Sequence, residues 1–312
     1  MLAMLLGVTG ALVAGVFISD NFSSDSEEEA ADTQPEDKAQ TDDEHAPVQI
    51  IDVADEEVPD DDPAITELTE ERDIHFGEDH GEIIHGLGGD DHIEGEGGDD
   101  RILGGMGDDA LHGKDGDDVL VGGDGDDALF GHNDDDTISG EAGNDRLTGG
   151  GGNDTLDGGT GHDRLEGKGG NDRLTGGAGL DTLFGGTGAD ILDGRDGEDD
   201  FLNGGDGDDT LIGDAGDMLH GGAGADTFVL AGDEADLPDT PAPTTISDYD
   251  GEIDRIVIML DPGSVPPVVE LHPSETGTDL HLDGQLAARI VDAIAMDPDE
   301  IEFVTSETLP AA

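Results

Sequence analysis

The 312-residue chain carries 81 acidic side chains against 11 Lys and Arg, which gives a formal net charge of −70. This charge excludes nucleic acid as a partner, since phosphate binding needs clustered Lys and Arg, and it disfavours anionic lipid surfaces while attracting cations. With 53 glycines, 3% aromatic residues and no cysteine, the composition excludes disulfides and thiolate metal sites and favours a repeat or a disordered chain over an ordinary globular core.

The first eighteen residues, Met1–Ile18, contain no charged side chain. As a helix they would extend about 27 Å, just enough to cross the hydrocarbon core of a bilayer. A signal peptide is the alternative, but no Lys or Arg precedes the apolar stretch and no clear A-x-A cleavage site follows it. We expect an uncleaved segment that anchors the protein in a membrane.

Residues 19–72 are rich in Asp, Glu, Ser, Thr and Pro and include the charge blocks DSEEE and PDDDP. Because such a stretch repels itself and has little apolar surface to bury, we expect an extended, disordered acidic linker. A specific acidic recognition tail is the alternative.

A nine-residue repeat dominates residues 73–230, which we expect to form one domain. It is written in full as GGDGDDALF, GGDGDDTLI and GGAGADTFV. Sixteen frames begin between Gly86 and Gly221, of which the frame starting at residue 194 is one residue too long and the frame starting at 213 is one too short. A degenerate frame, GEDHGEIIH, precedes them and has Glu82 at its sixth position.

Three positions of the repeat are nearly invariant along the chain. The sixth is Asp, the eighth is Ile, Leu or Phe, and the fourth is Gly except at Asp134. Glycine permits the tight turn, while the last three residues form a short strand with one side chain pointing inward. Two repeats then complete a coil of eighteen residues, so we expect an all-β solenoid of two parallel sheets with the apolar side chains between them.

Stacking the coils has an electrostatic consequence. Turns on one edge lie about 4.8 Å apart, so the position-six carboxylates of successive coils repel each other unless a cation lies between them. Carboxylates and turn carbonyls are the hard oxygen ligands that suit Ca²⁺. The candidate metal ligands are Asp91, Asp100, Asp109, Asp118, Asp127, Asp136, Asp145, Asp154, Asp163, Asp172, Asp181, Asp190, Asp199 or Asp200, Asp209, Asp217 and Asp226.

The in-phase pattern G-G-x-G-x-D-x-U-x is similar to the RTX (hemolysin-type) calcium-binding repeat, over roughly residues 77–260. The resemblance implies a right-handed parallel β-roll, in which position-six carboxylates of successive turns and backbone carbonyls hold each Ca²⁺. Eight turns on each of two edges would make about fourteen calcium sites. It also implies a secreted or cell-surface protein of a Gram-negative bacterium. Because one apolar side chain per repeat is a small core, we expect the repeats to fold only with Ca²⁺.

The fifth position is acidic in the early repeats, from Asp90 to Asp135, and becomes Asn in several later ones. We expect these side chains to face solvent. Weak additional cation binding is the alternative.

Residues 231–312 contain β-rich runs, and the alternating stretch around Asp283-Gly284 predicts a hairpin. We expect a small β-rich C-terminal cap. The RTX resemblance implies an uncleaved export signal in this region, with the type I secretion machinery as a partner. A plain cap that shields the edge of the last coil is the alternative.

We find no motif of an enzyme. Neither H-E-x-x-H nor G-x-S-x-G occurs, and HFGEDH has Asp79 where an inverted zinc-peptidase motif needs His. We expect His75, His80 and His85 to belong to a structural N-terminal cap, and we predict no catalytic or cofactor-binding residue apart from the calcium ligands. The alternatives are an adhesion or export module acting on a surface polymer, for which only Tyr249 and eight Phe supply aromatic rings, and an enzyme with an unrecognised site.

Overall fold

The computed structural model describes residues 65–231, 242–292, 296–298 and 301–305. The expected membrane anchor, Met1–Ile18, and the expected linker as far as residue 64 lie outside these residues. Within the described ranges, no helix is long and apolar enough to span a membrane.

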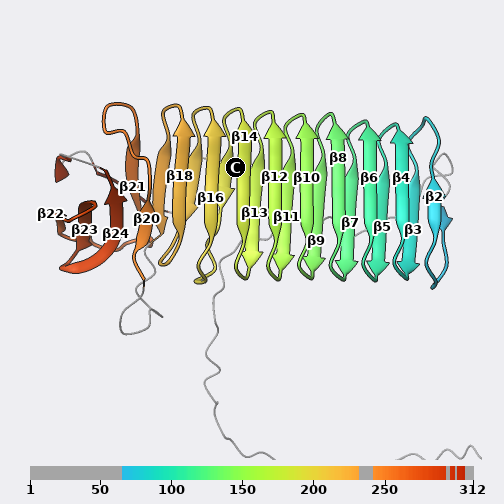
Figure 1. Ribbon diagram of the computed structural model, residues 1–312, viewed down its shortest axis with the longest axis horizontal. Helices are drawn as coiled ribbons and strands as arrows, with labels where there is room; N and C mark the ends of the chain where they lie inside the picture. The colour runs from blue at the N-terminus through green and yellow to red at the C-terminus, as the bar shows by residue number, and fades with distance from the viewer. Residues whose placement is uncertain (1–64, 232–241, 293–295, 299–300, 306–312) are drawn as a thin grey trace, which may run out of the picture. The chain divides into compact units, whose positions relative to one another are not determined.

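The described chain winds through strands that alternate between two sheets (Figure 1). Sheet A contains β1 (Ile65–Glu67), β3 (Ile83–Gly88), β5 (Arg101–Met106), β7 (Val119–Asp124), β9 (Thr137–Ala142), β11 (Thr155–Thr160), β13 (Arg173–Ala178), β15 (Ile191–Asp193), β17 (Thr210–Gly213), β19 (Thr227–Ala231), β21 (Arg255–Leu260) and β25 (Glu302–Thr305). Sheet B contains β2 (Ile74–Phe76), β4 (His92–Gly97), β6 (Ala110–Asp115), β8 (Ala128–Asn133), β10 (Arg146–Gly151), β12 (Arg164–Gly169), β14 (Thr182–Thr187), β16 (Phe201–Asp206), β18 (Met218–Ala223), β20 (Thr244–Ile246), β24 (Gln285–Val291), β23 (Gly277–Leu282) and β22 (Val269–Pro273).

The register confirms the predicted eighteen-residue coil. In sheet B, Leu111 pairs with Leu129, which pairs in turn with Leu147, and all the strands of the repeats are parallel. The result is an all-β parallel solenoid of about nine turns. A parallel sheet needs a crossover between successive strands, and here the crossover from one strand of sheet A to the next is a single strand of sheet B with its two turns.

The core is one column of position-eight side chains between the sheets. Each of them is at most 1% exposed. They are Ile84, Ile93, Ile102, Leu111, Leu120, Leu129, Ile138, Leu147, Leu156, Leu165, Leu174, Leu183, Leu192, Leu202, Leu211, Leu219 and Phe228. The predicted inward position is therefore confirmed, and each repeat contributes a single fully buried side chain of this column.

Glycine at the fourth position makes the close stacking of turns possible. Gly107 has φ +124°, and a Cβ there would collide with the carbonyl oxygen of Gly89 in the preceding coil. Asp134, which replaces this glycine in one frame, adopts φ +71° and so keeps the left-handed turn. Asp is one of the few side chains that tolerate that region.

The solenoid begins before the expected domain boundary at residue 73. β1 starts at Ile65 and pairs in parallel with β3, while β2 contains His75. His75 pairs with Ile93 and so lies at a core position of the first coil, whereas His80 is exposed outside the strands. The last eight residues of the expected linker therefore already carry a strand.

The C-terminal strands continue both sheets. β20, β21 and β25 add in parallel, and β22, β23 and β24 form an antiparallel meander at the end of sheet B. The predicted hairpin is present: β23 and β24 are joined by Asp283 and Gly284, with φ +50° and +82°. Two positive φ values are the signature of the turn that matches strand twist.

Candidate metal centre: two aspartate ladders

Every position-six aspartate of the ladders stands immediately before a strand, in the turn that leads into it. Except in the last member of each ladder, the backbone N–H donates a hydrogen bond to Oδ1 of the equivalent aspartate in the next coil, over 2.7–3.0 Å. Ladder B, before the strands of sheet B, contains Asp73, Asp91, Asp109, Asp127, Asp145, Asp163, Asp181, Asp200 and Asp217. Ladder A contains Glu82, Asp100, Asp118, Asp136, Asp154, Asp172, Asp190, Asp209, Asp226 and Asp254.

The second carboxylate oxygen has no partner inside the ladders. The position-six aspartates from Asp91 to Asp226 that belong to the two ladders are 0–3% exposed. Among the described residues, Oδ2 is buried without a hydrogen bond in Asp91, Asp100, Asp109, Asp118, Asp127, Asp136, Asp145, Asp154, Asp163, Asp172, Asp181, Asp190, Asp200 and Asp209. A buried carboxylate oxygen without a partner is costly, so the interior of each ladder calls for a cation.

The ladder ends differ from the interior. Oδ2 of Asp73 accepts from the Thr69 backbone and hydroxyl, and Oδ2 of Asp217 accepts from the Asp214 N–H at 2.7 Å. In ladder A, Oε2 of Glu82 accepts from the Glu78 N–H at 2.7 Å. Turns at these ends therefore satisfy their own carboxylates, as the interior turns do not.

Position-one glycines bring more oxygen atoms to each gap. A Cβ on Gly104 would collide with Oδ2 of Asp109 and would lie 2.7 Å from the carbonyl oxygen of Gly122 in the next coil. The partnerless Oδ2 and a backbone carbonyl thus lie near one point that only glycine leaves free. Within the described ranges, no three His, Asp or Glu side chains converge as a ready metal site, so a cation here would depend on the carboxylates and backbone carbonyls together. This all-oxygen donor set fits Ca²⁺.

Burial shifts the protonation of the interior aspartates. Desolvation, with a smaller contribution from the charges of Asp154 and Asp118, raises the pKa of Asp136 to about 8. For the same leading reason the pKa of Asp200 rises to about 9 and that of Asp109 to about 7. Without a cation the neutral forms of Asp136 and Asp200 would be favoured at pH 7, and a divalent cation would stabilise their charged forms.

The irregular repeats keep the ladder intact. Asp200 is 3% exposed and bridges Asp181 and Asp217, whereas Asp199 is exposed and lies outside both ladders. The extra residue of the long frame is therefore accommodated in the turn before Asp200. Asp217, in the short frame, is fully buried.

Sequence reasoning missed two ladder members, Asp73 and Asp254. Asp73 stands eighteen residues before Asp91, in phase with the repeat, and could have been found by extending the frames backwards. Asp254 follows Asp226 by 28 residues, so the period gives no signal. Only the local D-x-U pattern of Asp254-Arg255-Ile256 resembles the repeat.

Position-five side chains form an exposed column beside each ladder, as predicted. The N–H of Asp126 donates to Oδ1 of Asp108 at 3.0 Å, and the N–H of Asn144 donates to Oδ1 of Asp126 at 2.8 Å. These carboxylates are exposed to water.

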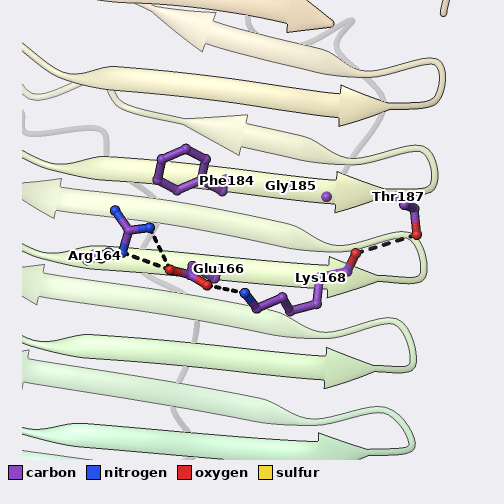
Figure 2. Close-up of a pocket in the computed structure, with 7 residues that line it drawn as sticks. Arg164, Glu166, Lys168, Phe184, Gly185 and Thr187 are labelled. Carbon is purple, nitrogen blue, oxygen red and sulfur yellow. Dashed lines mark hydrogen bonds and ion pairs between the residues drawn. The ribbon is translucent and has the colours of Figure 1, made fainter. Parts of the chain in front are cut away.

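A shallow hollow of about 350 Å³ lies on the outer face of sheet B (Figure 2). The guanidinium of Arg164 lies 4.5 Å from the centre of the Phe184 ring and pairs with Glu166 at 2.6 Å, while Lys168 pairs with the other oxygen of Glu166. This is an aromatic-bearing surface of the kind that an adhesion module needs. Its cations are already paired, and the adhesion alternative stays a prediction.

Comparison with known families identifies the family of the repeats that carry the ladders. The model of the RTX calcium-binding nonapeptide repeat matches half of the chain, in segments at residues 76–111, 103–138, 130–165, 166–199, 196–228 and 217–233. The chain belongs to this RTX family. Membership implies calcium binding, and RTX repeat proteins are typically secreted. Only the calcium-binding repeat domain is recognised, with no catalytic domain. A search of curated proteins found no match.

Proposed function

We propose that this RTX protein is a non-enzymatic calcium-binding protein whose repeats fold outside the cell when Ca²⁺ fills the two ladders. The observation that carries the proposal is the set of partnerless, buried Oδ2 atoms, which recur at the same place in every interior turn. A periodic structural accident would not leave so many carboxylate oxygens without a donor, because each costs free energy.

The ligands would be the position-six aspartates of the two ladders together with turn carbonyls. Between Asp91 and Asp217, and between Asp100 and Asp226, each ladder has eight aspartates and so seven gaps. Each ladder also has seven partnerless Oδ2 atoms, one for each gap. About fourteen Ca²⁺ ions follow. In the long frame the ligand would be Asp200, and Asp199 would not take part.

Calcium would act by neutralising charge that the fold brings together. Most strands of the repeats bury one large apolar side chain, and each turn buries one carboxylate, so without a cation apolar burial has to oppose both desolvation and repulsion between carboxylates. Metal binding is then coupled to folding. Extracellular calcium modules work at about 0.1–1 mM Ca²⁺, which fits a protein that stays unfolded until it is exported.

Export would use a signal in the C-terminal region and the type I secretion machinery, as the RTX resemblance implies. The membrane anchor proposed for Met1–Ile18 would keep the protein on the cell surface, and cleavage there would release it.

Far-UV circular dichroism of the full chain tests the proposal. Calcium would be raised from an excess of chelator to about 10 mM, with Mg²⁺ as the control. We expect a cooperative gain of β signal with Ca²⁺ alone, and equilibrium dialysis at the plateau should count about fourteen ions per chain. A signal that does not respond to Ca²⁺, or an equal response to Mg²⁺, would refute the proposal.

A further inference from the structure

The outer face of sheet B carries a cluster of imidazoles that the calcium ladders do not use. His92 lies on β4, His112 on β6 and His132 near the end of β8, on three neighbouring strands. The ring centres of His92 and His112 are 5.4 Å apart, and those of His112 and His132 are 5.3 Å apart. All three side chains are half-buried.

Two nitrogen atoms of this cluster face each other directly. Nδ1 of His112 lies 3.0 Å from Nε2 of His132, and the Phe130 ring stacks on His112 at 4.7 Å with the planes 7° apart. A hydrogen bond between two ring nitrogens requires that one of them is an unprotonated acceptor. Burial, with the nearby charge of Lys114, also lowers the pKa of His112 to about 4, so its ring is neutral near pH 7.

We propose that His112 and His132 form a binding site for a borderline divalent metal of the Zn²⁺ class, separate from the calcium ladders. Two nitrogens bound to one tetrahedral Zn²⁺ lie about 3.3 Å apart, which is close to the separation of these two atoms in the protein. Imidazole nitrogen suits Zn²⁺, Cu²⁺ or Ni²⁺, whereas Ca²⁺ takes oxygen ligands. On binding, the proton between the two nitrogens would move to the other nitrogen of its own ring, and the metal would take its place.

The surrounding charges act in opposite directions. Oε1 of Glu94 lies 3.1 Å from Nε2 of His92, and Oε2 of Glu94 pairs with Lys114 at 3.1 Å. The carboxylate would favour a bound cation and the ammonium would oppose it. Since the described residues hold no ready group of three ligands, water would complete the coordination of the metal. The large negative charge of the chain raises the local concentration of cations.

Titration calorimetry of the full chain with Zn²⁺, at saturating Ca²⁺, tests the site. The variants are His112→Phe, which keeps a ring against Phe130, and His132→Gly, which takes the residue that its register partner Gly150 already has. The control is the double variant His272→Ala/His281→Ala, which removes two rings whose centres are 4.6 Å apart in the C-terminal meander. Circular dichroism in Ca²⁺ checks that each variant is folded.

We expect one Zn²⁺ per chain, bound at least about tenfold more weakly by His112→Phe or by His132→Gly and unchanged in the control. Lys114→Gln should tighten binding, since it removes the opposing charge. X-ray absorption should report nitrogen ligands on the metal. The proposal is overturned if the folded wild-type chain binds no Zn²⁺ in calcium, if the His112 and His132 variants bind it as well as the wild type, or if only the control variant loses it.

Discussion

The RTX repeats and the C-terminal strands belong to the same two sheets, but they satisfy their buried groups differently. In the repeats, a turn such as that of Asp136 leaves one buried carboxylate oxygen without a partner. At Asp254, the last member of ladder A, Oδ1 accepts from the Asp226 N–H at 2.9 Å and Oδ2 accepts from the Asp250 N–H at 2.7 Å.

The repeats and the C-terminal strands also differ in how many apolar side chains each strand buries. A typical repeat strand buries one large apolar side chain, whereas β21 buries Ile256, Val257, Ile258 and Met259 in succession. Apolar burial contributes about 1.5–3 kcal/mol for each such side chain. If calcium fills the ladders as proposed, dependence on a cation would be a local property of the interior turns that the C-terminal strands do not share.

Of the changes that test this difference between the two regions, acidification in the presence of chelator should have the largest effect. Because the pKa values of the interior ladder aspartates are raised, from about 6 at Asp118 to about 9 at Asp200, the folded state binds protons more tightly than the unfolded state. The stability from protonation is fully present below the ordinary Asp pKa and is lost as pH rises through about 6–9. We expect more β signal near pH 5 than near pH 9 without calcium.

Saturating calcium supplies the control for that experiment, since it should remove the loss of β signal between these two pH values. An equal β signal at both pH values in chelator would contradict the account.

Removing one ladder carboxylate should have the next largest effect. Asp136→Asn takes a charge from the middle of ladder A, and loss of a charged ligand of this kind costs about 1.5–3 kcal/mol. Because this loss is shared among about fourteen ions that bind together, the calcium midpoint should rise by a factor of about 1.2–1.4. The neighbouring variant Asp135→Asn changes an exposed carboxylate and should shift the midpoint little. If both variants shifted the midpoint equally, total charge rather than the ladder would control calcium binding.

Two glycines of one repeat allow a substitution against the ladder carboxylate to be compared with a substitution in open space. A Cβ on Gly149 would collide with Oδ2 of Asp154, while a Cβ on Gly151 would meet nothing within 4 Å. In calcium, Gly149→Ala should lower the free energy of unfolding by about 1–3 kcal/mol. Gly151→Ala should change it by less than about 0.5 kcal/mol. Denaturant titration measures both, and equal losses would mean that the carboxylate does not lie against position one.

The smallest effect on the calcium midpoint is expected for a substitution outside the repeats. Gly284 has φ +82° in the hairpin turn between β23 and β24, so Gly284→Ala should destabilise the C-terminal strands by about 1–2 kcal/mol. The calcium midpoint of the repeats should not move. A shifted midpoint would show that the two regions fold as one unit.

The period made most of the fold and the ladders predictable from sequence. One residue at each fixed position specifies the turn, the inward side chain and the buried carboxylate, and repetition places them in register. The choice between Asp199 and Asp200 was not predictable, because either could precede the strand that carries Leu202 and only three-dimensional packing decides between them.

Features that do not follow the nine-residue period had no comparable signal in the sequence. Asp254 joins ladder A across a break in phase, and β1 lies in a stretch whose composition is that of a linker. The contact of His112 with His132 joins positions nine and two of different repeats, twenty residues apart. It is diagonal to the register, so no alignment of the frames reveals it.

Hydrogen–deuterium exchange of the full chain, with and without calcium, tests the central claim most directly. Amides of the repeat strands between β3 and β19 should be protected in calcium and lose that protection in chelator, because their carboxylates then lack a partner. Protection of β21 and of the β23–β24 hairpin should fall less. Repeat amides that stay as protected in chelator as in calcium would contradict the claim that the ladders depend on the cation.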